Sequence, residues 1–157
     1  MATIQTAFSI SANKSSATTT PGPLSVALSA SASNSLTVDN VRSEIVTVPD
    51  HSGESDEATR IIDGSNYTSG TAGTHGGYVY MKNISAASAS TYIMIGVEAE
   101  GVADGSLADI SDASDALRLM SLKVGEWAFF PFDYNQDITA RASAVGQLLE
   151  YWVFDRA

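Results

Sequence analysis

Cysteine is absent from this sequence of 157 residues. Without it the chain has no disulfide framework, no thiolate zinc site and no cysteine nucleophile. A cysteine-free chain folds equally well in oxidising and reducing compartments. The redox chemistry of the surroundings therefore places no constraint on this protein.

Basic residues are scarce. The chain holds 8 lysines and arginines against 18 aspartates and glutamates, which gives a formal net charge of −10. Proteins that bind nucleic acid neutralise its phosphates with lysine and arginine, and an acidic chain is repelled by them. We therefore expect no nucleic-acid partner.

Long hydrophobic runs are missing as well. The longest apolar stretches, residues 128–132 and 151–154, are far shorter than the roughly 20 residues that cross a bilayer. The first eight residues lack the basic start and the apolar run of a secretory signal. We expect a protein that is soluble and intracellular when it is made and has no membrane partner.

Short alternating segments make up most of the chain. Leu24, Val26 and Leu28 alternate with small residues, a pattern typical of a strand with one buried face. About eight to ten such segments follow at spacings of about 10 to 12 residues, and no long helical pattern interrupts them. The sequence predicts an all-β fold, an antiparallel two-sheet sandwich that is jelly-roll-like. An immunoglobulin-like sandwich is the alternative.

The length corresponds to a single domain, since domains contain about 150 residues. We expect one β-sandwich domain over residues 1–157, in which residues 1–23 could extend as an N-terminal arm. Within it, Asp39 and Asn40 separate the apolar segments 36–38 and 44–48 and predict a turn.

Two C-terminal segments are apolar on both faces. In residues 148–154, Trp152 and Phe154 alternate with Tyr151 and Val153, and residues 126–132 repeat the pattern. The outer face of a sandwich sheet normally meets water, so either the chain's own loops or a neighbouring subunit must cover it. The candidate interface residues, with those of the N-terminal segment, are Ile4, Phe8, Ile10, Trp127, Phe130, Trp152 and Phe154.

The sequence contains no catalytic signature. His51 and His75 lack metal-binding spacing, no GxSxG motif occurs, and the glycine-rich residues 70–77 lack the GK[ST] of a P-loop. Acidic residues between 98 and 115 predict a solvated loop or a calcium site, without the EF-hand pattern. We expect a protein that is not an enzyme, with no catalytic residues, no cofactor and no metal.

Three motifs follow one another in the second half of the chain. They are YVYMKN at 78–83, LKVGEWAFFP at 122–131 and EYWVF at 150–154. In this order they resemble the small virion structural proteins of tailed bacteriophages, notably those of cyanobacterial and marine phages. The resemblance covers residues 78–155 and is greatest to capsid decoration, or cement, proteins.

This resemblance implies a structural protein of the virion that binds the outer surface of a phage head and stabilises it. Its partners would be the major capsid protein and further copies of itself, in a homotrimer. Residues 2–11 could add a strand to the sheet edge of a shell protein. The alternative is a tail-fibre, neck or adhesin-type head domain that binds a host-surface glycan through Asn66, Tyr67 and His75.

Overall fold

A computed structural model describes residues 2–12, 28–50, 58–67, 76–86, 90–107, 110 and 117–156. The chain divides into two compact units, residues 1–38 and residues 39–157. The expectation of one domain over residues 1–157, with residues 1–23 as an extended arm, stays a prediction.

Strands account for 66% of the structure, and the described residues include no α-helix. The strands are β1 (Ala2–Ala12), β2 (Leu28–Val48), β3 (Thr59–Ile62), β4 (Gly77–Asn83), β5 (Tyr92–Ala99), β6 (Arg118–Lys123), β7 (Trp127–Phe132), β8 (Gln136–Ala142) and β9 (Gln147–Arg156). Two short 3₁₀ segments, η3 (Gly64–Tyr67) and η4 (Asp104–Ser106), connect them. The predicted all-β fold is confirmed.

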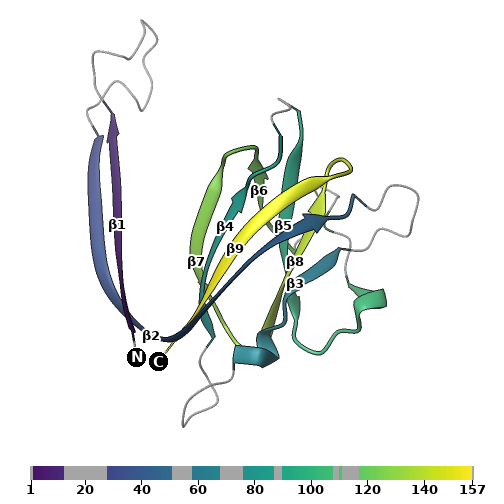
Figure 1. Cartoon of the computed structure of the whole chain (residues 1–157), viewed down its shortest axis with the longest axis horizontal. Coiled ribbons are helices and arrows are strands. Elements are labelled where there is room, and N and C mark those ends of the chain that lie inside the picture. The colour runs from purple at the N-terminus through teal and green to yellow at the C-terminus, as the bar shows by residue number, and fades with distance from the viewer. Residues whose placement is uncertain are drawn as a thin grey trace, which may run out of the picture. The chain divides into compact units, whose positions relative to one another are not determined.

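Two sheets carry these strands (Figure 1). One has the order β1-β2-β9-β4-β7 and the other the order β3-β8-β5-β6. Successive strands alternate between the sheets from β2 to β5 and again from β6 to β9. The four strands β2-β9-β4-β7 facing β3-β8-β5-β6 have the strand order of a jelly roll. The predicted antiparallel sandwich is confirmed.

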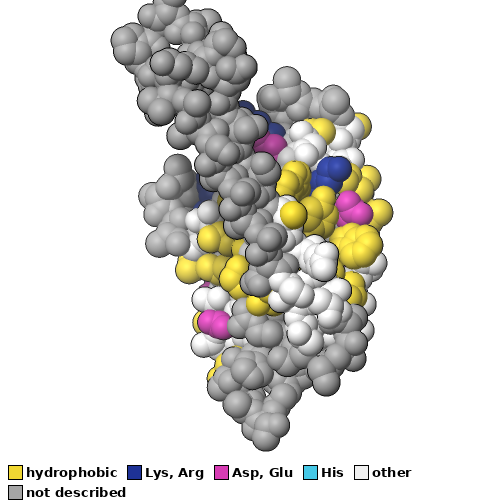
Figure 2. Space-filling model, turned by 90° about the vertical axis from the view of Figure 1, so that its left-hand side faces the viewer, with side chains coloured by type: hydrophobic (Ala, Val, Ile, Leu, Met, Phe, Trp, Pro, Cys, Tyr) yellow, Lys and Arg dark blue, Asp and Glu magenta, His cyan; other side chains and the backbone are white. Residues whose placement is uncertain are grey.

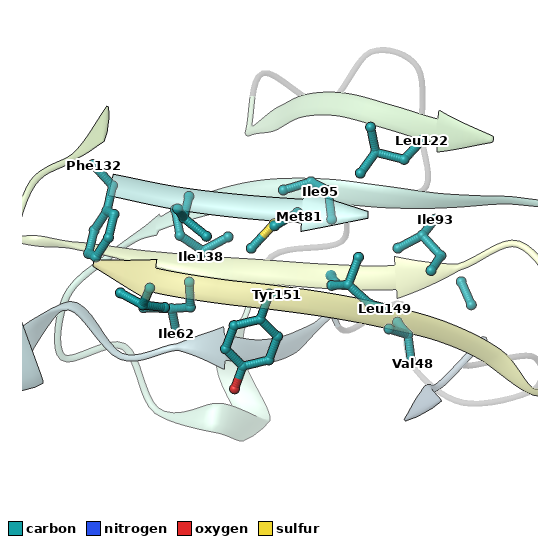
Figure 3. Close-up of a cluster of buried hydrophobic side chains, with 14 of the residues drawn as sticks. Val48, Ile62, Met81, Ile93, Ile95, Leu122, Phe132, Ile138, Leu149 and Tyr151 are labelled. Carbon is teal, nitrogen blue, oxygen red and sulfur yellow. The ribbon is translucent and has the colours of Figure 1, made fainter. Parts of the chain in front are cut away.

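Apolar side chains from both sheets meet in one core (Figure 3). In β4 every second residue from Gly77 to Asn83 is buried, as expected where side chains alternate between two faces of a sheet. The core contains Val48, Ile62, Val79, Met81, Ile93, Ile95, Leu122, Phe132, Ile138, Leu149, Tyr151 and Val153. It fixes which face of β4, β7 and β9 points outward.

β1 pairs with the first part of β2 as an antiparallel ribbon, from Ala2 opposite Val38 to Ala12 opposite Leu28. β2 then continues to Val48 without interruption, so the turn predicted at Asp39 and Asn40 is wrong. The pairing of β2 with β9 outweighs the local turn preference of these two residues. The boundary between the two units falls at the same point of the chain.

Candidate functional site

Six aromatic side chains share the outer face of β9, β4 and β7. Val79, Met81 and Val153 are fully buried in the core, so the residues between them point away from it. We call this surface the aromatic face. It consists of Tyr78, Tyr80, Trp127, Phe129, Trp152 and Phe154.

The strand register arranges the aromatic face in rows. Tyr80 of β4 lies opposite Trp152 of β9 on one side and Phe129 of β7 on the other. In the next row, Tyr78 lies opposite Phe154. Because directly opposed residues of antiparallel strands are close neighbours, each row brings rings from separate strands together.

The rings contact one another across the strands. The centroid distances are 5.9 Å for Tyr78–Phe129, 6.1 Å for Tyr80–Trp127, 6.2 Å for Phe129–Phe154 and 6.5 Å for Trp152–Phe154. These distances lie in the range of favourable aromatic pairs. The pairs stabilise the rings in their positions on the face.

The two tryptophans remain substantially exposed. Trp127 is 55% and Trp152 is 40% exposed in the part of the chain that the structure describes. Figure 2 shows large hydrophobic side chains at the surface around a basic and an acidic side chain. The described residues of this chain therefore leave the aromatic face open at both tryptophans.

A charged row borders the aromatic rows. Lys82 of β4 lies opposite Glu150 of β9 and Trp127 of β7. The Trp152 indole Nε1 donates a hydrogen bond to Glu150 Oε1 at 3.3 Å. Burial raises the pKa of the Tyr80 hydroxyl, and the negative charge of Glu150 raises it further. The row contributes one positive and one negative charge, so the face has little net charge.

A shallow groove lies beside Trp152, at the edge of the face. Its volume is about 320 Å³, and Ser43, Glu44, Ile45, Glu150 and Trp152 line it. The Tyr151 hydroxyl donates a hydrogen bond to Glu44 Oε2 at 2.6 Å. Burial, this hydrogen bond and the charge of Glu44 raise the pKa of Tyr151. The Glu44 carboxylate lies with Tyr151 on the core side of the sheet, so the groove combines one indole with one carboxylate, that of Glu150.

Three of the candidate interface residues, Trp127, Trp152 and Phe154, lie on the aromatic face. Phe130 is on the opposite face of β7, where it is partly buried against the core. In the sequence, Trp127 and Phe129 alternate with Phe130 and Phe132, which left open which of the two pairs points outward.

The N-terminal candidates belong to β1. Ile4 is partly buried and lies opposite Leu36. Phe8 and Ile10 lie opposite Ala32 and Ala30, and their side chains are outside the described part of the structure. The interface role of all these residues stays a prediction.

Sequence reasoning did not single out Tyr78, Tyr80 or Phe129. All three lie in the motifs at 78–83 and 122–131, and they alternate with residues of the core. Period-2 alternation of aromatic and aliphatic residues in YVYM was the available signal. This alternation shows that two residues share one face of a strand. It does not show which other strands lie next to that strand in the sheet.

The glycan alternative placed Tyr67 in a binding loop, and the structure places this residue in the core. Tyr67 is only 7% exposed. Its ring packs edge-on against Phe132 at 5.4 Å, and the Arg42 guanidinium lies 5.2 Å from its centroid. Asn66 is exposed, and His75 lies outside the described residues. Tyr67 is therefore unable to stack on a sugar at the surface.

The acidic region between 98 and 115 is described in part. Asp104 forms an ion pair with Arg60 at 2.6 Å, and Arg60 also pairs with the buried Asp137 at 2.8 Å. No group of three His, Cys, Asp or Glu side chains among the described residues is placed to hold a metal ion. Asp109, Asp112 and Asp115, like His51, lie outside these residues.

In the described ranges, no helix has the length and apolar character needed to span a bilayer. Comparison with protein-family models, with curated proteins and with solved structures returned no match to this chain.

Proposed function

We propose that this chain is a non-enzymatic structural protein of a phage virion, a decoration (cement) protein that binds the outer surface of the head. The aromatic face is the observation that carries this proposal. Contiguous apolar surface of this kind is uncommon on isolated proteins and marks interaction sites. Tryptophan and tyrosine dominate the binding energy of protein interfaces. The sequence motifs that resemble virion proteins are the ones that build this face.

The proposed partner of the aromatic face is the major capsid protein. A ligand that binds the assembled shell and not its free subunits stabilises the shell by mass action. Such binding requires a complementary contact surface, and it requires neither a catalytic site nor a cofactor. The acidic remainder of the chain, with its net charge of −10, would then face solvent and repel nucleic acid.

A homotrimer is part of the proposal. Three linked copies would present three aromatic faces to the shell together, and their combined affinity would far exceed that of one copy. β1 is the terminal strand of its sheet. Its outer edge could therefore extend a sheet of the shell protein by strand addition.

The proposal is tested on particles with and without the protein. We expect particles that lack it to release their genome at a lower temperature, and the purified protein to restore their stability when added back. Bound copies should cover the head in an electron-microscopy reconstruction. If depleted particles are equally heat-stable and fail to adsorb to cells, the proposal is wrong.

The groove beside Trp152 favours a second candidate, an adhesin-type head domain of a tail fibre or neck that binds a host glycan. An exposed indole next to polar groups is able to hold a sugar ring. Jelly rolls occur in lectins as well as in capsid proteins, so the fold does not decide between the two candidates. Copies confined to the tail would favour the adhesin.

A further inference from the structure

The groove beside Trp152 has a mixed lining. Ser43 and Ile45 come from β2, Glu150 and Trp152 from β9, and Glu44 lies between the two β2 residues. The volume of about 320 Å³ is at the lower end of the range for small-molecule pockets. It can hold one compact group, such as a single side chain, beside the indole.

The charge of the lining is negative. Glu150 contributes a carboxylate to the groove and no basic side chain lines it, whereas the Glu44 carboxylate points to the other face of β2, where it meets Tyr151. The Trp152 indole takes one hydrogen-bonding position on Glu150, while a carboxylate offers about four. Lys82 lies opposite Glu150 on the next strand but does not line the groove. The chain as a whole carries −10, which adds to the negative potential.

We propose that this groove binds an arginine side chain on the surface of the protein that the aromatic face contacts. A guanidinium stacks on an indole and donates hydrogen bonds to carboxylates at the same time. It is more weakly hydrated than the ammonium of lysine, so it loses less on entering a groove. Tryptophan and arginine are both enriched among the energetic centres of interfaces, and such centres tend to face one another across an interface.

This inference rests on the proposed function, since the arginine belongs to a protein partner. The inference also specifies the chemistry of the partner surface, which the aromatic face alone does not. The partner must be basic at the point that meets Trp152. A partner with a neutral or acidic surface there would leave Glu150 facing an apolar or like-charged group, at a cost in affinity.

The test is an NMR titration of the full chain with N-acetyl-arginine amide, observed at the two indole N–H signals. Trp127 and Trp152 are the two tryptophans of the chain, so Trp127, on the same face but outside the groove, is the internal control. Trp127→Phe assigns the signals. We expect the Trp152 signal to shift with saturation, and the Trp127 signal to stay in place.

A neutral analogue of the probe and variants of the groove separate the contribution of charge to binding from that of shape. N-acetyl-citrulline amide has the shape of the probe without its charge and should leave both signals unchanged. Glu150→Gln should weaken binding at the Trp152 indole signal by about two- to fivefold, because exposed ion pairs are individually modest. Trp152→Phe, which removes that indole signal and is therefore followed at the backbone amide of residue 152, should weaken binding by a similar factor, because the cation–π contact is also modest. The Glu150→Gln variant keeps a side-chain oxygen for the indole, so its fold is retained.

Three outcomes would overturn the inference. They are no shift with the arginine probe, equal shifts with the citrulline probe, and a shift with neutral monosaccharides instead. The last outcome would identify the groove as a glycan site. Binding of the Glu150→Gln variant to phage heads separates the two proposals. If heads bind this variant and the wild type equally, the arginine inference fails and the decoration function stands.

Discussion

Replacement of Trp127 by alanine removes the most exposed ring of the aromatic face. Trp127 is 55% exposed and contacts the Tyr80 ring at 6.1 Å. The substitution leaves the core unchanged, because no core side chain is shortened. We expect the free energy of unfolding to fall by about 1 kcal/mol or less, the worth of one aromatic pair.

The effect on attachment to the head should be larger. A large aromatic side chain presents up to about 250 Å², so the exposed part of Trp127 leaves roughly 140 Å² to be buried by a partner. At about 25 cal/mol per Å² this corresponds to an upper limit of about 3.5 kcal/mol. Ordering and desolvation on association reduce it to about 2 kcal/mol, a loss of about 30-fold in affinity per copy.

Heads that lack the protein provide the assay. Labelled wild type and variant are mixed with such heads at several concentrations, and the bound fraction is measured by sedimentation. Leu119→Ala is the matched control, because Leu119 is 48% exposed on β6 of the other sheet. If Trp127→Ala binds within about twofold of wild type, or if Leu119→Ala loses as much, the aromatic face is not the docking surface.

Three further predictions concern stability and the ribbon. Met81→Ala should lower the free energy of unfolding by about 2–5 kcal/mol in urea titrations, because Met81 is fully buried in the core; a loss below about 1 kcal/mol would contradict this packing. The folded-state pKa of Tyr151 is raised above its ordinary value of 10.0. Above pH 10 only the unfolded chain therefore loses this proton, so stability should fall as the pH rises, and Tyr151→Phe should reduce that slope. An unchanged slope in the variant would exclude Tyr151 as its source. Deletion of residues 2–12 should weaken attachment to heads while the circular dichroism of the sandwich persists, whereas full attachment would show that β1 makes no contact with the shell.

Local alternation made the strands predictable. The period-2 pattern of residues 148–154 predicted a strand with two apolar faces, and β9 contains it. The same reasoning failed at Asp39 and Asn40, where two local turn formers lie inside a long strand. The turn preference of these two residues stabilises less than the hydrogen bonds that β2 makes with its neighbouring strands. Those strands are distant in the sequence, so local patterns do not reveal the pairing.

The site itself depended on non-local pairing. Trp152 and Phe154 could be placed on one face from sequence, but their neighbours on β4 follow only from the register of two strands far apart in the chain. The groove requires β2 beside β9. On the core side of the same two strands, the contact between Glu44 and Tyr151 joins residues 107 positions apart. Such neighbours are selected by packing of the whole sandwich rather than by any local pattern.

The length of β2 has a mechanical consequence. Residues of this one strand belong to both compact units, since β2 runs from Leu28 to Val48 and the units divide after Val38. A pull on the N-terminal ribbon is therefore transmitted along a continuous backbone into the sheet of the second unit. Force along a strand loads its ladder of hydrogen bonds together instead of opening them one by one, and resistance to such force depends on the unfolding rate.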